Sequence, residues 1–505
     1  MDIVKNCILF FLIFLFCHEV FGVVGDSVNL NVKNFNTSGY SQVTATCQSI
    51  EVSSEGTVEL LVDNNIIQEE SITQNIFENF YQSIYPYIHE NYGKEGDVDS
   101  SKSISILITK IEDTSKLNKA YFSKIDFHPS TESGYENSNF REILYVDYDF
   151  YNFEPNECMR QLTVAFTEMV CNSYSQDKSK FLIKGISEYS AYMAGYGIPD
   201  SFIDAYRINN VSLFPNSEND AFMGKVFMFI KYLVNEYGNN IVKEIAQDTG
   251  TSGREIIETY TGENFNDIFM EFSKLLYCPI SYGDFQKSTT SFFYNYPLIK
   301  NSLTLPSYES VGIRLNKFWP KYFLGIENFV NSSGDNAVLK AELLLFKNNV
   351  LDSIEVLSAE NGAKFTPRFD YDCDKVILLL TAMPESNTAD TFTLDLKVIE
   401  SDNNFYVFSN PIFRNQVMVF FKNASSINSI ILIDPNKTQT QLNVHSSSVH
   451  NSTGETNNFS WYSWFIATLS GKYQLIVNIT DTDGNTYEKT HEFIVGQDEL
   501  DNTKY

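Results

Sequence analysis

The chain of 505 residues is long enough for several hydrophobic cores, since 43% of it is hydrophobic and 20% is charged. Its 64 acidic and 36 basic residues give a formal net charge of −28. This balance argues against nucleic acid or an anionic membrane surface as a partner, because both require clustered lysine and arginine. We expect three or four structural units.

The first 22 residues have the pattern of a secretory signal peptide. Asp2 and Lys5 precede an apolar run at residues 8–17, and residues 20–22 fit a cleavage site. The run is too short for a spanning helix, and no later segment reaches about 18 apolar residues. An N-terminal membrane anchor is the alternative interpretation. We expect no membrane insertion in the mature chain, which would be secreted, extracellular or lumenal in the secretory pathway.

The sequence also carries sites for N-linked glycosylation, which agree with a secretory route. Each Asn-x-Ser/Thr site is a weak signal by itself, but the sites crowd together in the last part of the chain. We therefore expect an exposed, glycosylated C-terminal region. The candidate residues are Asn36, Asn210, Asn331, Asn423, Asn436, Asn451, Asn458 and Asn478.

The cysteines do not form the pattern of a disulfide scaffold. Those that remain after signal removal are odd in number and widely spaced, which allows at most two bridges and leaves one thiol over. If Cys158 and Cys171 lie on one helix, about 20 Å separates them, far beyond the roughly 6 Å that a disulfide allows. The residues are Cys47, Cys158, Cys171, Cys278 and Cys373.

Residues 23–70 are predicted to be rich in β-structure, with strands at 42–46 and 58–62. An amphipathic helix follows, and Gly93 is its predicted stop. A polar segment then leads into an apolar strand at 104–109. The helix has one apolar side, formed by Ile76, Phe77, Phe80, Ile84, Tyr87 and Ile88.

Asp97 and Asp99 alternate just before that strand, as carboxylates do at the start of a calcium-binding loop. However, Ser101 and Lys102 stand where such a loop has an acceptor and a turn glycine, and no glutamate closes it. A solvated turn is therefore the favoured interpretation.

Residues 161–195 read as two helices joined by a polar turn, and the rest of the chain is interpreted around them. Apolar residues recur at helical spacing in the first helix, and the second follows a glycine. The first apolar set is Leu162, Ala165, Phe166, Met169 and Val170; the second is Ile186, Tyr189, Ala191, Tyr192 and Met193.

This layout resembles the active-site helix pair of zinc metallopeptidases, in which His-Glu-x-x-His is followed by a Glu-Gly-x-x-Glu-Tyr segment. Residues 167–171 here are Thr-Glu-Met-Val-Cys, and residues 184–189 are Lys-Gly-Ile-Ser-Glu-Tyr. An ordered series of segments over residues 58–280 is similar to the secreted hyicolysin-type (gluzincin) family. The segments are 84–86, 92–93, 97–99, 104–107, 121–123, 138–139, 142–147, 224–233, 236–238 and 265–269.

The resemblance implies a role for each residue of the helix pair, and the residues present depart from those roles. Thr167, Cys171 and Lys184 occupy the positions of the three zinc ligands, and Glu168 that of the general base. A hydroxyl is a poor zinc ligand, and an ammonium repels the ion. Glu188 and Tyr189 match the family's second helix. We therefore expect a degenerate site with no metal and a vestigial Glu168.

Two arrangements of Glu168 follow from this departure. In the first, the Lys184 ammonium takes the place of zinc and neutralises Glu168 across the two helices. In the second, Lys184 reaches solvent and Glu168 finds hydroxyl partners such as Thr167 or Tyr189. A metal site reassembled from Cys171, Glu168 and Glu188 is a further alternative, and only this reading requires zinc as a cofactor.

From residue 286 the chain changes to short strands separated by turn residues, which is typical of β-sandwiches. Strands are predicted at 337–346, 376–380 and 392–398, and then at 417–420, 430–433, 461–469 and 473–479. Asp483-Gly484 predicts a hairpin turn. Residues 471–485 resemble the end of an immunoglobulin-like adhesion module, a fold that carries no function by itself.

The predicted fold class is α+β: a zincin-like domain with a β-rich N-terminal part, followed by two β-sandwich domains, the second immunoglobulin-like. The predicted divisions are a signal peptide (1–22), a β-rich segment (23–70), a gluzincin-like domain (71–285), two sandwiches (286–402 and 403–497) and a polar tail (498–505).

The predicted function is that of a secreted pseudopeptidase that binds an extracellular protein or glycan. An active metalloendopeptidase with atypical ligands is the alternative, and a structural surface or matrix protein is the third possibility.

Overall fold

The protein is described by a computed structural model. Within the chain, contacts separate two compact units: Met1–Phe202 with Met223–Phe265, and Ile203–Phe222 with Asn266–Tyr505. The structure describes residues 23–54, 56–66, 69–115, 118–214, 217–278, 287–291, 300–315, 323–331, 337–348, 350–357, 364–365, 375–384, 391–399, 405–409, 416–422, 424–446, 459–481 and 483–495. The expected signal peptide and polar tail lie outside these residues.

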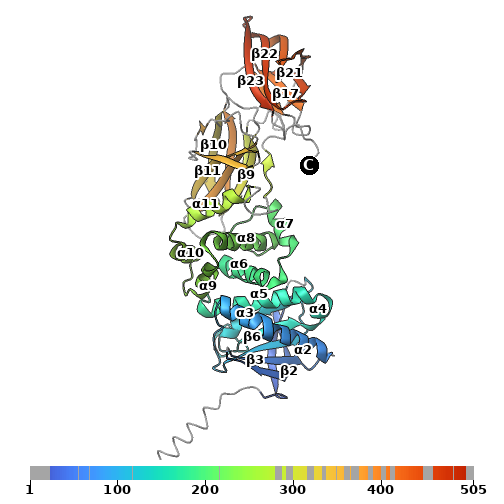
Figure 1. Ribbon diagram of the computed structural model, residues 1–505, viewed down its shortest axis with the longest axis vertical. Helices are drawn as coiled ribbons and strands as arrows, with labels where there is room; N and C mark the ends of the chain where they lie inside the picture. The colour runs from blue at the N-terminus through green and yellow to red at the C-terminus, as the bar shows by residue number, and fades with distance from the viewer. Residues whose placement is uncertain are drawn as a thin grey trace, which may run out of the picture. The chain divides into compact units, whose positions relative to one another are not determined.

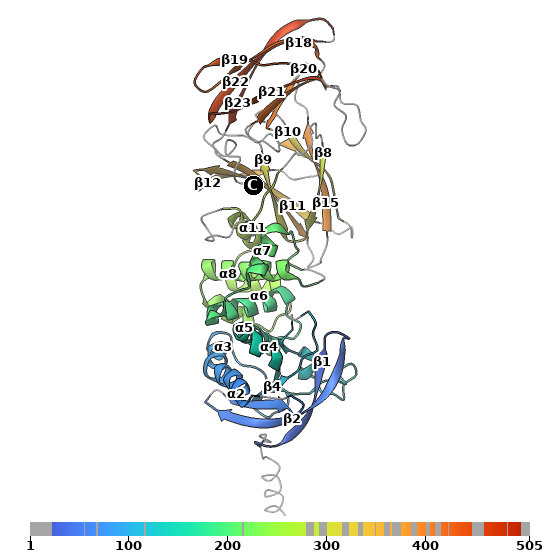
Figure 2. The same cartoon turned by 90° about the vertical axis from the view of Figure 1, so that its right-hand side faces the viewer.

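A curled six-stranded sheet forms the base of the first unit (Figures 1 and 2). Its strand order is β1-β2-β3-β4-β6-β5, so the N-terminal strands belong to the same sheet as the strands that follow the first helices. The β3–β4 and β4–β6 pairs are parallel and the others antiparallel. The strands are β1 (Ser27–Asn34), β2 (Gly39–Val52), β3 (Thr57–Asp63), β4 (Ser103–Thr109), β5 (Ala120–Phe122) and β6 (Ile143–Asp147).

The three central strands consist largely of apolar runs, and the structure buries every residue in them. Such runs are expected where a parallel sheet is covered on both faces. The connection from β3 to β4 is a helical crossover, which parallel strands require. The elements of that crossover are α2 (Glu70–Asn79), the π-helical turn η1 (Phe80–Ile84) and α3 (Tyr85–Asn91).

Helix α5 (Pro155–Tyr174) contacts strands β5 and β6 on one side and helix α6 (Lys180–Ala191) on the other. Figure 1 shows α5 between the sheet and α6. The two helices predicted around residues 161–195 are therefore present, with a polar turn between them. The unit's other helical elements are α4 (Tyr148–Phe153), the turn η3 (Tyr192–Tyr196), most of α8 (Asp220–Tyr237), α9 (Asn240–Gln247) and α10 (Gly253–Thr261).

The second unit contains most of α7 (Asp200–Ile208), nearly all of α11 (Phe265–Leu276), and four sheets whose pairings are antiparallel except for β7 with β9. The first two sheets have the orders β13-β10-β15-β8 and β12-β11-β14-β9-β7. Their strands are β7 (Thr290–Ser291), β8 (Lys300–Pro306), β9 (Glu309–Leu315), β10 (Phe323–Asn331), β11 (Ala337–Lys347), β12 (Val350–Leu357), β13 (Lys364–Phe365), β14 (Lys375–Pro384) and β15 (Thr391–Ile399).

The remaining two sheets have the orders β16-β17-β21-β20 and β19-β18-β22-β23. Pairs of separate antiparallel sheets are consistent with the β-sandwich prediction. Gly484, at φ 86°, occupies the predicted hairpin turn between β22 and β23. The strands are β16 (Phe405–Ser409), β17 (Gln416–Lys422), β18 (Ala424–Ile433), β19 (Gln439–Gln441), β20 (His445–Ser446), β21 (Phe459–Ile466), β22 (Gly471–Asp481) and β23 (Thr486–Val495).

The positions of strands within these sheets explain their different patterns of burial. β14 lies between β11 and β9 and is buried along almost its whole length. β22 alternates buried and partly exposed residues, as a strand with one solvated face does. Among the described residues, no helix has both the length and the apolar character needed to cross a bilayer.

Candidate functional site

Helices α5 and α6 carry the residues at which a metallopeptidase-like site is predicted. Pro155 stands in the first turn of α5, where its missing N–H costs no helical hydrogen bond. The helix then packs against β5 and β6 on one side and against α6 on the other. Gly185 allows α6 to approach α8 closely, because a Cβ at this position would lie 2.9 Å from the backbone oxygen of Val226.

Glu168 and Lys184 form an ion pair across the two helices. The Lys184 Nζ lies 2.6 Å from Glu168 Oε1, and both side chains are mostly buried, with 23% and 15% of their surfaces exposed. The distance is that of a charge-assisted hydrogen bond. Of the two arrangements predicted for Glu168, the structure contains the one in which the ammonium faces the carboxylate.

The other two predicted ligand positions are also filled by groups unsuited to zinc. The Thr167 Oγ1 lies 2.7 Å from the Ser190 hydroxyl and donates to the backbone oxygen of Thr163. Cys171 is fully buried, and burial raises the pKa of its thiol to about 12. Because the thiolate is the form that binds zinc, an ion at this position would first have to displace the thiol proton.

Glu188 is held by an arginine that the sequence interpretation did not identify. Arg160 donates from Nη1 to Glu188 Oε2 at 2.5 Å and makes two further bonds of 2.7 Å to the carboxylate of Glu157. Burial raises the pKa of Glu188, and the positive charges of Arg160 and Lys184 oppose that shift. The i, i+3 spacing of Glu157 and Arg160 is a signal that could have revealed their pairing, but nothing in the sequence linked Arg160 to Glu188.

Tyr189 faces a group of aromatic side chains. Its ring lies 6.2 Å from that of Tyr192 and 6.3 Å from that of Phe227, measured between centroids. Only 6% of the Tyr189 surface is exposed. The ring therefore packs as part of the helical core, and the structure gives it no bond to Glu168.

The charged groups of this helix pair are engaged with one another in ion pairs. Two cations, Arg160 and Lys184, meet three carboxylates, Glu157, Glu168 and Glu188. A reassembled site from Cys171, Glu168 and Glu188 would have to break both buried ion pairs. Within the described residues, the acidic cluster able to hold a metal ion is a different one, formed by Asp97, Asp99 and Glu142.

The cysteines and glycosylation sites can be placed only in part. Cys158 and Cys171 both lie on α5, and together with Cys47 and Cys278 they are buried and free of disulfides. Cys373 lies outside the described residues. Among the predicted glycosylation sites, Asn36, Asn210 and Asn436 are exposed and Asn478 is partly exposed, whereas the side chain of Asn331 and residues Asn423, Asn451 and Asn458 are not described.

Comparison with protein-family models gives no match, and comparison with curated proteins gives no match either. The resemblance to the hyicolysin-type family therefore depends on the residues of the chain itself.

Proposed function

We propose that the chain is a catalytically inactive homologue of secreted zinc metallopeptidases, and that it acts by binding an extracellular protein or glycan. The observation that carries the proposal is the 2.6 Å ion pair between Lys184 and Glu168. A peptidase of this class needs a bound Zn²⁺ to lower the pKa of a water molecule, and it needs a free carboxylate to accept the proton. Here the carboxylate is engaged by a lysine.

The surroundings of the pair support the same conclusion. A divalent ion next to the Lys184 ammonium would be repelled. Two unit charges of the same sign 4 Å apart near a protein surface already repel each other by about 4 kcal/mol. Thr167 is satisfied by neighbouring hydroxyl and carbonyl groups, and the Cys171 thiol is neutral. The first unit in this proposal keeps the zincin-like arrangement of helices on a sheet without its chemistry.

The binding role is proposed for the β-rich second unit as well as for the first. Among the described strands, β12 is an edge strand of its sheet. Three of its apolar side chains are exposed: Val350, Ile354 and Val356. A sheet edge with exposed apolar residues is a surface to which another chain can add. In this proposal the second sandwich is immunoglobulin-like, and the protein is secreted and glycosylated.

Metal analysis and a proteolysis assay of the purified chain test the proposal. We expect the purified chain to contain no stoichiometric zinc. We also expect it to show no chelator-sensitive cleavage of unfolded protein substrates. A matched variant restores the ligand set with Thr167→His, Cys171→His and Lys184→Glu. If the two helices have metallopeptidase geometry, this variant binds about one zinc per chain, provided that circular dichroism shows it to be folded.

The outcomes separate the candidate functions. Stoichiometric zinc in the wild-type chain, with chelator-sensitive cleavage, would replace the proposal with an active metalloendopeptidase. Binding of the full chain to arrayed glycans or extracellular proteins supports the binding role. If the Val356→Asp variant binds less than the wild type, the edge of β12 is the binding surface. A chain that binds neither zinc nor any partner would favour a structural role.

A further inference from the structure

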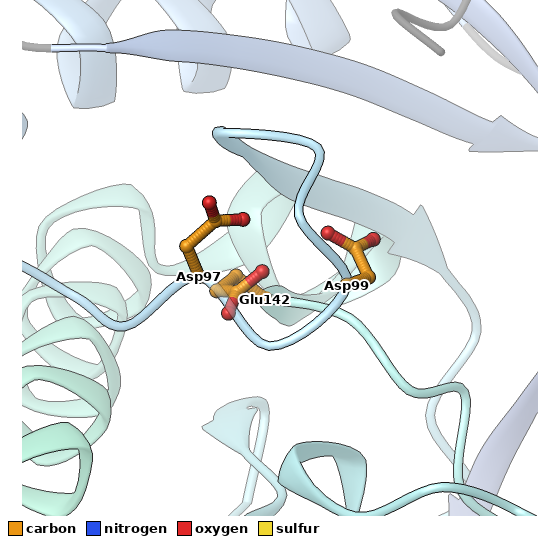
Figure 3. Close-up of side chains that lie close together, drawn as sticks. All are labelled: Asp97, Asp99 and Glu142. Atoms are coloured by element: carbon orange, nitrogen blue, oxygen red, sulfur yellow. The ribbon is translucent and has the colours of Figure 1, made fainter. Parts of the chain in front are cut away.

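The loop between α3 and β4 meets the beginning of β6 at a group of three carboxylates. Asp97 and Asp99 come from the loop, and Glu142 directly precedes β6. One oxygen from each carboxylate lies within 4.8 Å of the other two. Figure 3 shows the carboxyl groups of Asp97 and Asp99 on either side of Glu142. The sequence interpretation considered the two aspartates but lacked Glu142, which follows more than 40 residues later.

Glu142 is the unusual member of the cluster. It is only 1% exposed, and one of its oxygens, Oε1, accepts a hydrogen bond from the backbone N–H of Val98 at 2.5 Å. The second oxygen, Oε2, is buried and has no hydrogen-bond partner. A buried carboxylate oxygen without a partner is costly, because it has lost its water and gained nothing in exchange. An ordered water molecule or a bound ion can satisfy such an atom.

The charge at this place also needs compensation. The structure holds Asp97 and Asp99 near Glu142 through the turn itself: Asp97 Oδ1 accepts from the N–H of Lys102 at 3.0 Å, and Asp99 Oδ1 from that of Ser101 at 2.9 Å. Burial raises the pKa of Glu142, as do the negative charges of Asp99 and Asp97, while backbone N–H groups oppose the shift. Three carboxylates this close together repel one another, and a bound cation would compensate that repulsion.

The geometry points to a calcium site formed by Asp97, Asp99 and Glu142, with Glu142 Oε2 as a direct ligand and water completing the coordination. Three carboxylates are hard oxygen donors of the kind that Ca²⁺ prefers, whereas zinc favours nitrogen and sulfur. Asp97 is exposed and also lines a surface pocket together with Gly96 and Ser103, so that an ion can reach the cluster from solvent. This site is independent of the chemistry of α5 and α6.

The bound ion would join three parts of the first unit. Glu142 is fixed to the sheet, because its backbone oxygen accepts a hydrogen bond from the N–H of Ser105 on β4. The loop in turn contacts the end of α5, where the Ser173 hydroxyl donates to the backbone oxygen of Lys94 at 3.2 Å. Calcium at the cluster therefore ties the loop to the sheet beside the C-terminal end of α5, and we expect it to stabilise this unit.

Calorimetric titration tests the site. CaCl2 or MgCl2 is titrated into the full chain after a chelator has removed bound metal. We expect saturable binding of Ca²⁺ and a calcium-dependent rise in the melting temperature. The Glu142→Gln variant keeps an acceptor for Val98 but loses the charge and the ligand, and it should bind Ca²⁺ about tenfold or more weakly, since charge count tunes such sites. Glu90→Gln, an exposed change on α3, is the matched control and should bind as the wild type does.

The melting temperature of the metal-free variant shows whether weaker Ca²⁺ binding results from misfolding. Removal of a buried charge relieves repulsion, so Glu142→Gln without metal should melt at or above the temperature of the metal-free wild type. A second variant, Asp99→Asn, should also weaken Ca²⁺ binding. The proposal fails if the wild type shows no Ca²⁺ binding at millimolar concentration, if Glu142→Gln binds Ca²⁺ like the wild type, or if Mg²⁺ binds as tightly as Ca²⁺. The zinc measurement can succeed or fail independently of this result.

Discussion

The buried cluster of Arg160, Glu157 and Glu188 shows how single residues hold the helix pair together. Arg160 has 6% of its side chain exposed and Glu188 has 3%. Both groups have therefore lost most of their hydration, and the ion pair compensates for that loss. Replacing both partners of such a pair by apolar groups can be harmless, whereas removing one leaves an uncompensated charge at a cost of about 3–5 kcal/mol. The pair is therefore a sensitive point for stability.

We expect Arg160→Met to destabilise the first unit by about 3–5 kcal/mol near neutral pH. The sign of the pH dependence follows from Glu188, whose pKa burial raises above its unfolded value. Without Arg160 that pKa rises further, so protonated Glu188 is tolerated at about pH 5 and ionised Glu188 is costly at about pH 8. The loss measured by urea unfolding should therefore be larger at the higher pH.

Two further variants make this prediction specific. Glu188→Gln combined with Arg160→Met removes the orphaned charge and should recover much of the lost stability and abolish its pH dependence. Arg207→Met breaks the ion pair between Arg207 and Asp204, which is largely exposed, and should cost no more than about 1 kcal/mol. Equal losses at both pH values would contradict the assigned role of Glu188.

The sequence allowed one of the two buried ion pairs to be predicted. The resemblance puts Lys184 at a zinc-ligand position close to Glu168, so pairing of the lysine with the glutamate was one of the two arrangements expected. Arg160 reaches Glu188 across a separation of 28 residues. Such a contact depends on how α5 and α6 are rotated about their axes, and the apolar pattern alone does not fix that rotation to within one side chain.

At the scale of elements, the close approach of α6 and α8 depends on Gly185. An ideal Cβ there would lie 2.6 Å from Ile230 Cγ1 and 2.9 Å from the backbone oxygen of Val226. In an exposed helix, a change from glycine to alanine stabilises by up to about 1 kcal/mol. Here the backbone of α8 would have to move, and overpacking of this kind costs about 1–3 kcal/mol.

We therefore expect Gly185→Ala to lower the stability of the first unit, against the trend of helix propensity. Thermal unfolding followed by circular dichroism measures the change. Asn75→Ala lies on the exposed side of α2 and serves as the control, because it should be neutral or slightly stabilising. A Gly185→Ala variant as stable as the wild type would mean that α6 and α8 can separate at little cost.

Element boundaries were harder to predict than element types. The apolar pattern from Ile76 to Ile88 predicts one helix, whereas the structure divides this stretch into α2, a π-helical turn and α3. Pro86 explains the break, because it cannot donate the hydrogen bond that an uninterrupted α-helix requires there. Likewise, Asp97 and Asp99 were seen as a pair, but the sequence cannot show that the start of β6 brings Glu142 to them.

At the scale of the whole molecule, the sequence predicted mixed helices and sheets and the change to β-structure near residue 286. It could not show that β1, β2 and β3 share a sheet with β4, β5 and β6, since strand pairing is a long-range property. Nor did it indicate that residues 203–222 belong with the later part of the chain. A buried ion pair in the second unit, between Lys287 and Glu309, was also unforeseen; both side chains are 1% exposed.

The division into two compact units predicts that they unfold in separate steps. Each unit contains its own buried ion pair, Arg160 with Glu188 in the first and Lys287 with Glu309 in the second. Lys287 also lies over the ring of Tyr206, 4.2 Å from its centroid, so its loss removes a packing contact as well as a charge. Lys287→Met should therefore cost the second unit about 3–5 kcal/mol, as Arg160→Met does the first.

Differential scanning calorimetry of the full chain distinguishes independent units from a single cooperative one. We expect Arg160→Met to lower one transition and Lys287→Met to lower a different one, each leaving the other unchanged, because changes that share no partners act independently. Calcium should raise the transition that Arg160→Met lowers and leave the one that Lys287→Met lowers in place. If both variants shift one common transition by similar amounts, the units fold as a single body and the calcium loop stabilises the whole chain.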